Sequence, residues 1–165
     1  MRTLTLLSAV LACAAGGSGA HAGPTGAYAQ LAALAWDWEA DLPGFGKLTN
    51  TIRVVSKGQA VEETIGTTAE NETSLYSRDG AGLLLTHYCA LTPEGHIARL
   101  AAQPAPGAAD RLEFLFTGAT NLPGLDAPHM RRVLISFSDP DHFTEQWTKS
   151  ENGKDTVFEL HFVRR

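Results

Sequence analysis

The chain has 165 residues, 44% of them hydrophobic, and its 13 Lys and Arg against 18 Asp and Glu produce a formal net charge of −5. That length suits one domain and is long enough to bury a core without cross-links. The acidic balance and the lack of a basic stripe argue against nucleic acid and anionic membrane surfaces as partners.

The first 22 residues are predicted to be an export leader. Arg2 precedes an apolar run over 4–15, and Ala20-His21-Ala22 has the small-x-small form of a cleavage site. The run is too short to span a bilayer as a stable helix, so no transmembrane segment is expected. We favour cleavage after Ala22 over lipidation at Cys13, and we expect export to the periplasm or the medium.

The mature chain, residues 23–165, is expected to form a single domain with one cysteine, Cys89. A single thiol cannot form an internal disulfide, so hydrophobic burial alone must hold this domain together.

After the leader, the sequence predicts one short helix and then many short strands. Pro24 and Thr25 precede good helix formers, which predicts a helix over 25–34 and then a strand through Trp36 and Trp38. Both tryptophans are expected to close one end of the fold together with the helix. The further strands are expected at 48–56, 59–66, 71–78, 82–91, 96–102, 111–118, 129–138, 142–150 and 154–165.

Nine to ten short strands joined mostly by hairpins indicate an all-β fold. Sequential hairpins favour an up-and-down antiparallel barrel, because closing the sheet removes its exposed edges. Alternation along the strands then predicts which side chains face inward. The predicted interior includes Leu112, Phe114, Phe116, Val133, Ile135, Phe137, Phe158, Leu160 and Phe162.

His87 and Cys89 are two residues apart on one predicted strand, so both project from the same face, about 6.5–7 Å apart. A neutral imidazole can activate a thiol or bind a soft metal ion together with it. Glu63, His129 and Glu145 also have inward parity, which predicts a polar cluster in the barrel. We interpret this cluster as a hydrogen-bonded network and assign neither a metal site nor a catalytic residue.

The tetrapeptide Thr86-His87-Tyr88-Cys89 is accompanied by Tyr76, an Asp79-Gly80 turn, a His129-Met130 pair and Trp147. In this pattern the chain resembles an uncharacterised family of secreted bacterial lipocalin-like (calycin-type) β-barrel proteins, over roughly residues 31 to 164. The resemblance implies a lipocalin-like barrel with an internal pocket. After the tetrapeptide the sequence reads "LTPEGHIARL", where that family usually has a more polar turn.

The expected function is non-enzymatic binding of a small apolar or amphipathic molecule inside the barrel. The predicted ligand-binding residues are Glu63, His87, Cys89, Phe114, Phe116, His129, Val133, Ile135 and Trp147. No cofactor is assigned, although haem is one variant of the guest, with His87 and His129 as axial ligands.

Two alternatives stay open at this point. One is a small hydrolase or isomerase that uses Glu63 as base and His87 as acid, which requires both groups on one face. The other is a fully packed barrel that acts as a structural or interaction module through its outer surface.

Overall fold

The structure is a computed structural model that describes residues 26–42, 44, 46–67, 69–89, 96–102 and 110–165. The predicted leader over 1–22, with Cys13, lies outside the described residues, as does the end of the strand predicted at 82–91. The elements are α1 (Ala27–Ala33), β1 (Asp37–Leu42), β2 (Gly46–Val55), a 3₁₀ turn (Ser56–Gly58), β3 (Ala60–Gly66), β4 (Asn71–Asp79), β5 (Gly82–Tyr88), β6 (Ile97–Ala102), β7 (Arg111–Thr120), β8 (His129–Asp139), β9 (His142–Glu151) and β10 (Lys154–Arg164).

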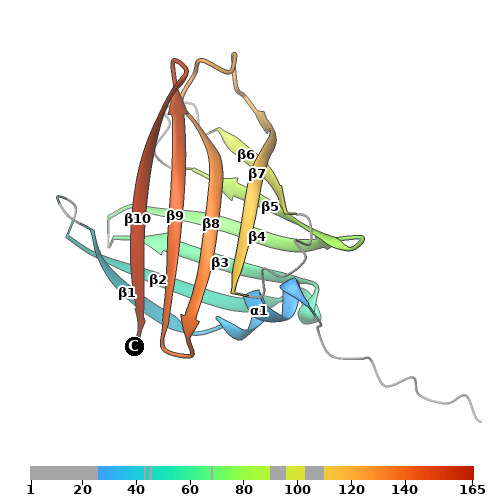
Figure 1. The fold of residues 1–165 in the computed structure, drawn as a ribbon, viewed down its shortest axis with the longest axis vertical. Helices are drawn as coiled ribbons and strands as arrows, with labels where there is room; N and C mark the ends of the chain where they lie inside the picture. Colours follow the sequence, from blue (N-terminus) through green and yellow to red (C-terminus); the bar gives the residue numbers. More distant parts are fainter. Residues whose placement is uncertain (1–25, 43, 45, 68, 90–95, 103–109) are drawn as a thin grey trace, which may run out of the picture.

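The ten strands form one closed antiparallel barrel, which confirms the predicted fold class (Figure 1). Each strand pairs with the next strand in the chain, and β1 closes the barrel by pairing with β10 at Trp38 and Arg164. Closure gives every strand two partners and leaves no long edge exposed. This architecture is compatible with a calycin-like fold.

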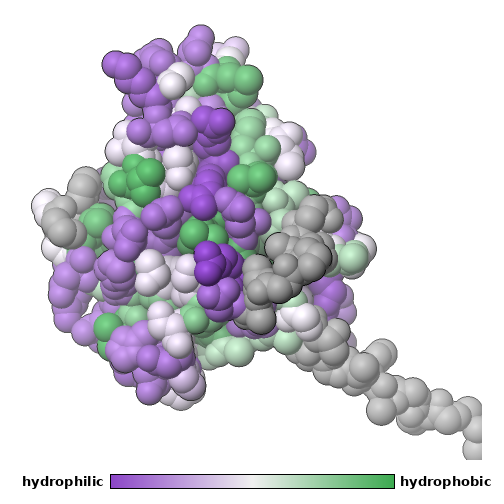
Figure 2. All heavy atoms as spheres, in the orientation of Figure 1, coloured by the Kyte–Doolittle hydropathy of each residue, from purple (hydrophilic) through white to green (hydrophobic). Residues whose placement is uncertain are grey.

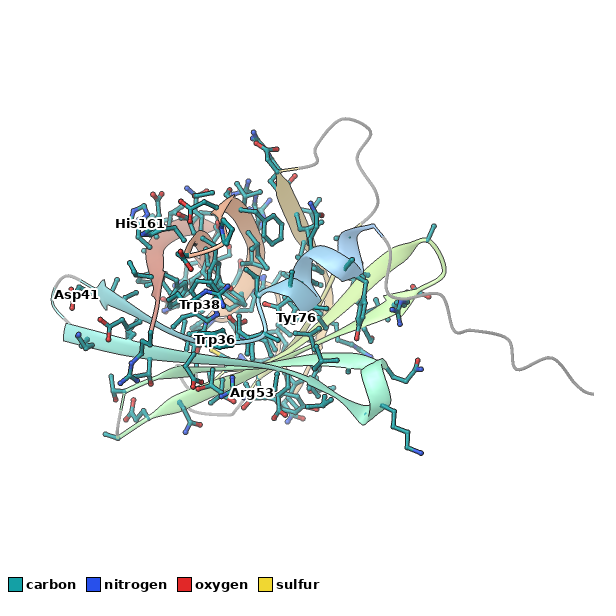
Figure 3. All side chains as sticks on the ribbon, turned by 90° about the horizontal axis from the view of Figure 1, so that it is seen from below. Trp36, Trp38, Asp41, Arg53, Tyr76 and His161 are labelled. Carbon is teal, nitrogen blue, oxygen red and sulfur yellow. The ribbon has the colours of Figure 1, made fainter. Side chains whose placement is uncertain are left out.

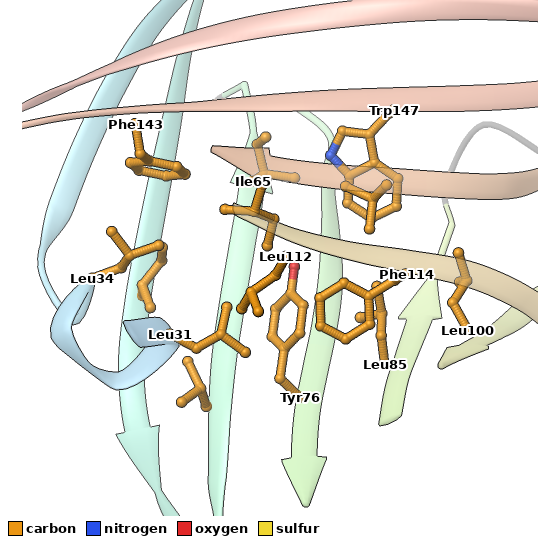
Figure 4. Packing of buried hydrophobic residues seen from close by; sticks show 14 of the residues in the cluster. Leu31, Leu34, Ile65, Tyr76, Leu85, Leu100, Leu112, Phe114, Phe143 and Trp147 are labelled. Carbon is orange, nitrogen blue, oxygen red and sulfur yellow. The ribbon is translucent and has the colours of Figure 1, made fainter. Parts of the chain in front are cut away.

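Alternation along the strands directs apolar side chains inward, as predicted. Six of the nine side chains expected inside are buried, namely Leu112, Phe114, Val133, Ile135, Leu160 and Phe162. Phe116, Phe137 and Phe158 are partly buried and pack against this core. Figure 4 shows the central part of the cluster, where the Tyr76 and Phe114 rings meet edge to face with centroids 5.5 Å apart.

The helix closes one end of the barrel, called here the closed end. It begins at Ala27, slightly later than predicted, and its Tyr28 hydroxyl donates a 2.9 Å hydrogen bond to the Gly58 carbonyl in the turn after β2. Trp38 is fully buried beneath it and donates from Nε1 to the Leu34 carbonyl at 2.8 Å. Figure 3 shows α1 lying across this end, with Trp38 beside it.

Trp36 does not share the buried position predicted for it. It precedes β1, is 49% exposed, and donates from Nε1 to the Arg165 carbonyl at 2.9 Å. A position for Trp36 on the same face as Trp38 needs an extended strand through both tryptophans, and the strand begins only at Asp37.

The face of the molecule drawn in Figure 2 is mainly polar, with scattered apolar residues. Among the described residues, no helix combines the length and apolar character needed to cross a membrane.

Candidate functional site

A row of polar side chains crosses the inside of the barrel on β3, β4 and β5. Glu63 pairs in register with Ser74, and Ser74 pairs with His87, so the three side chains project from one face. Each is about 1% exposed. Buried polar groups need hydrogen-bond partners, and this row supplies one such bond internally, between Ser74 Oγ and His87 Nδ1.

The Glu63 carboxylate accepts hydrogen bonds at both oxygens. Asn50 Nδ2 donates to Oε1 at 2.6 Å, and the Tyr76 hydroxyl donates to Oε2 at 2.7 Å. Burial, together with the nearby Glu63 and Glu145 carboxyl groups, raises the pKa of Tyr76 well above its ordinary value, so the phenol keeps its proton and donates.

A second buried carboxyl group, Glu145 on β9, interacts with Glu63 inside the barrel. Burial, and then the charge of Glu63, raise the pKa of Glu145 well above its ordinary value. Glu145 Oε2 accepts a 2.8 Å hydrogen bond from Trp147 Nε1. The raised pKa favours the protonated form of the Glu145 carboxyl group.

His87 lies between this network and the end of the barrel opposite α1. Its Nδ1 makes a 3.0 Å hydrogen bond with Ser74 Oγ, and its ring packs against the Trp147 ring at 4.6 Å. Burial lowers the pKa of His87 to about 4, so the imidazole is neutral at neutral pH. Its Nε2 points toward Glu72 Oε2, 3.5 Å away.

Cys89 follows β5 on the same side as His87, as predicted. Its thiol donates to Glu72 Oε1 over 3.5 Å. Cys89 is 8% exposed, and the Glu72 side chain is 18% exposed. Glu72, His87 and Cys89 therefore gather three different donor groups at one place.

An apolar cavity of about 380 Å³ occupies the end of the barrel opposite α1, called here the open end. Its apolar lining comes from six of the ten strands, and its charged lining consists of two acids and one lysine. The lining residues are Leu42, Leu48, Ile65, Gly66, Thr67, Glu70, Glu72, Met130, Trp147, Lys149, Phe158 and Leu160.

The predicted ligand-binding residues occupy different environments. Trp147 lines the open-end cavity, and its ring contacts His87. Glu63 and Cys89 are buried and do not line the cavity. Phe114, Val133 and Ile135 lie in the core and do not line the cavity. Contact between these residues and a bound ligand stays a prediction.

His129 does not point into the barrel, contrary to the expectation from its parity with Val133. The β8–β9 register shifts between Met130 and Arg132, and this bulge reverses the alternation. Met130 takes the inward position and lines the cavity, while His129 packs on Phe116 with ring centroids 4.7 Å apart.

His129 and Phe116 contribute to a second groove, where β7 and β8 separate after Leu115 pairs with Arg132. His87 is buried inside the barrel, whereas His129 lines this groove. Haem binding, with His87 and His129 as axial ligands, stays a prediction.

Sequence reasoning missed Asn50, Tyr76 and Glu72 as site residues. Glu72 has the same parity as Ser74 and Tyr76 on β4, and this alternation was the available signal.

No family model matches this chain, and no curated protein is similar to it in sequence. The site must therefore be interpreted from its own geometry.

Proposed function

We propose that this protein binds a small, mainly apolar molecule with one polar end in the cavity at the open end of the barrel. The observation that carries the proposal is the cavity itself. Its volume of about 380 Å³ falls in the range of sites that enclose small ligands, and most of its lining side chains are apolar.

The arrangement of charge indicates how such a guest would be oriented. Trp147 and Phe158 offer aromatic surface to an apolar body. Glu70, Glu72 and Lys149 are the charged residues of the lining, and Lys149 also pairs with Glu151 at 3.1 Å. A guest with an apolar body and one polar end satisfies both kinds of lining.

The enzyme alternative has less support from the geometry. Glu63 and His87 do project from one interior face, as that alternative requires. Neither residue lines the cavity. Glu63 is hydrogen-bonded to Asn50 and Tyr76, and His87 is hydrogen-bonded to Ser74. We further propose that the protein acts after export, in the periplasm or the medium.

The test is binding of a neutral fluorophore, N-phenyl-1-naphthylamine, to the mature protein. We expect its fluorescence to rise on binding and Leu48→Trp to weaken the affinity about tenfold or more, because the larger ring occupies the cavity. Thr49→Trp, on the exposed face of the same strand, is the matched control and should bind as the unmodified protein does. Equal affinities for both variants, or no binding by the unmodified protein, would refute the proposal.

A further inference from the structure

Three potential metal ligands meet at the open end of the barrel. The ligand atoms of Glu72, His87 and Cys89 all lie within 4.8 Å of one another. Glu72 comes from β4 and the other two from β5 and the residue after it. The pairing of Thr73 with Tyr88 places Glu72 opposite Cys89, so the antiparallel register itself assembles the cluster.

A buried nitrogen in this cluster has no hydrogen bond. His87 Nε2 has no hydrogen-bond partner among the described residues, although the side chain is only 1% exposed. Glu72 Oε2 is 3.5 Å from this nitrogen, which exceeds the usual length of a hydrogen bond. An unsatisfied buried polar atom is costly and requires an explanation.

The other ring nitrogen of His87, Nδ1, has the kind of hydrogen bond that is found in many metal-binding histidines. If Nδ1–H donates to Ser74 Oγ, at 3.0 Å, the lone pair of Nε2 faces Glu72 and Cys89. Metal-bound histidines commonly use their other nitrogen in this way, which fixes the tautomer and the ring orientation.

The distances also suit a metal ion. Zinc binds cysteine sulfur at about 2.3 Å, and histidine nitrogen and carboxylate oxygen at about 2.0–2.2 Å, so ligand atoms in a tetrahedral site lie roughly 3.3–3.8 Å apart. Two of the separations here are 3.5 Å, from Glu72 Oε2 to His87 Nε2 and from Glu72 Oε1 to Cys89 Sγ. All three donor groups therefore lie near the spacing that one bound ion requires.

We propose that Glu72, His87 and Cys89 bind a divalent transition-metal ion of borderline softness, with Zn²⁺ as the best match. Thiolate, imidazole and carboxylate donors together favour zinc over the hard ions Mg²⁺ and Ca²⁺. Binding releases the Cys89 thiol proton to solvent, and the two negative ligands then balance the charge of the ion.

Three protein ligands leave one coordination position open. Glu72 lines the apolar cavity, as does Trp147, which packs on His87. The open position therefore faces the cavity and accepts water or another small donor. Open positions of this kind distinguish reactive zinc sites from purely structural ones.

The test uses Co²⁺ as a spectroscopic substitute for zinc, in mature protein without a histidine tag. We expect one Co²⁺ per chain, with a thiolate-to-cobalt charge-transfer band and intense visible bands of a tetrahedral ion, all displaced by Zn²⁺. Cys89→Ser should abolish the charge-transfer band. Glu72→Gln should weaken affinity on the order of 100-fold, because one of three ligands is lost. The side chain of Glu72 is partly exposed, so this variant should fold normally.

His142→Gln is the matched control, because His142 is exposed and lies at the closed end, beside Asp139. It should leave the spectrum and the affinity unchanged. The proposal is overturned if cobalt gives no charge-transfer band with the unmodified protein. It is also overturned if binding survives Glu72→Gln and Cys89→Ser but is lost in His142→Gln, which would place the ion on the surface. The apolar fluorophore is absent, so this outcome is independent of the proposed function.

Discussion

The two ends of the barrel are built from the same strands but differ in what fills them. At the closed end, α1 covers Trp38, whose ring meets Phe143 edge to face at 4.8 Å, and Phe143 stacks on Phe162 at 4.7 Å. At the open end, the described residues leave an apolar cavity beside Trp147. The comparison shows that one helix and a few aromatic rings are enough to fill one end of this barrel with packed side chains.

Between the two ends lies the polar layer of Glu63, Tyr76 and Glu145. Its hydrogen bonds extend from Asn50 on β2 to Tyr76 on β4, and Trp147 on β9 links it to the cavity. Such networks stabilise a fold best when every member is satisfied, and Asn50 Oδ1 has no hydrogen-bond partner among the described residues. This layer separates the packed half of the interior from the half that we propose to be functional.

Removal of the buried Trp38 ring at the closed end is expected to have the largest effect on stability. Trp38→Ala should lower the free energy of unfolding by about 3–5 kcal/mol, because a fully buried ring leaves a cavity at the closed end. Trp36→Ala is the control, since that side chain is 49% exposed, and it should cost less than about 1 kcal/mol. Urea denaturation followed by circular dichroism measures both values. Similar losses for the two variants would contradict the account of the closed end.

The polar layer should make stability depend on pH. Because the pKa of Glu145 is raised in the folded state, the contribution of Glu145 to folding stability is fully present below the ordinary carboxyl pKa and is lost as pH rises through the folded-state value. One proton contributes at most about 1.4 kcal/mol per pH unit. Glu145→Gln should therefore gain stability relative to the unmodified protein between about pH 5 and pH 7.

Denaturant unfolding at about pH 5 and about pH 7 measures the free energy of unfolding of both proteins. Glu159→Gln, at an exposed position on β10, is the control and should leave the pH dependence unchanged. A parallel pH dependence for Glu145→Gln and the unmodified protein would show that Glu145 does not titrate differently on folding.

The smallest expected effect is the difference in destabilisation between two leucine variants, one at each end of the barrel. Leu31→Ala on α1 removes a side chain packed on all sides, whereas Leu48→Ala widens a cavity that already exists. Both should destabilise within the usual range of about 2–5 kcal/mol, with Leu31→Ala costing about 1 kcal/mol more. Equal losses would mean that the open end is packed as tightly as the closed end.

The sequence by itself determined the class of fold, because inward and outward residues alternate along each strand and hairpin turns join consecutive strands. The apolar positions of β7, β8 and β10, and the inward positions of Glu63, His87 and Glu145, follow from that period of two alone. These features depend on local spacing, which a single chain records directly.

Only the tertiary structure decided which inward residues meet. Register brings Glu72 beside Cys89, a bulge turns His129 away from the interior, and the start of β1 at Asp37 leaves Trp36 exposed. Local alternation predicts none of these contacts, since it fixes neither the pairing register nor the residue at which a strand begins, and a bulge reverses the side chains beyond it. The cavity likewise arises from how strands from both halves of the chain meet at one end of the barrel, which depends on contacts between residues far apart in the sequence.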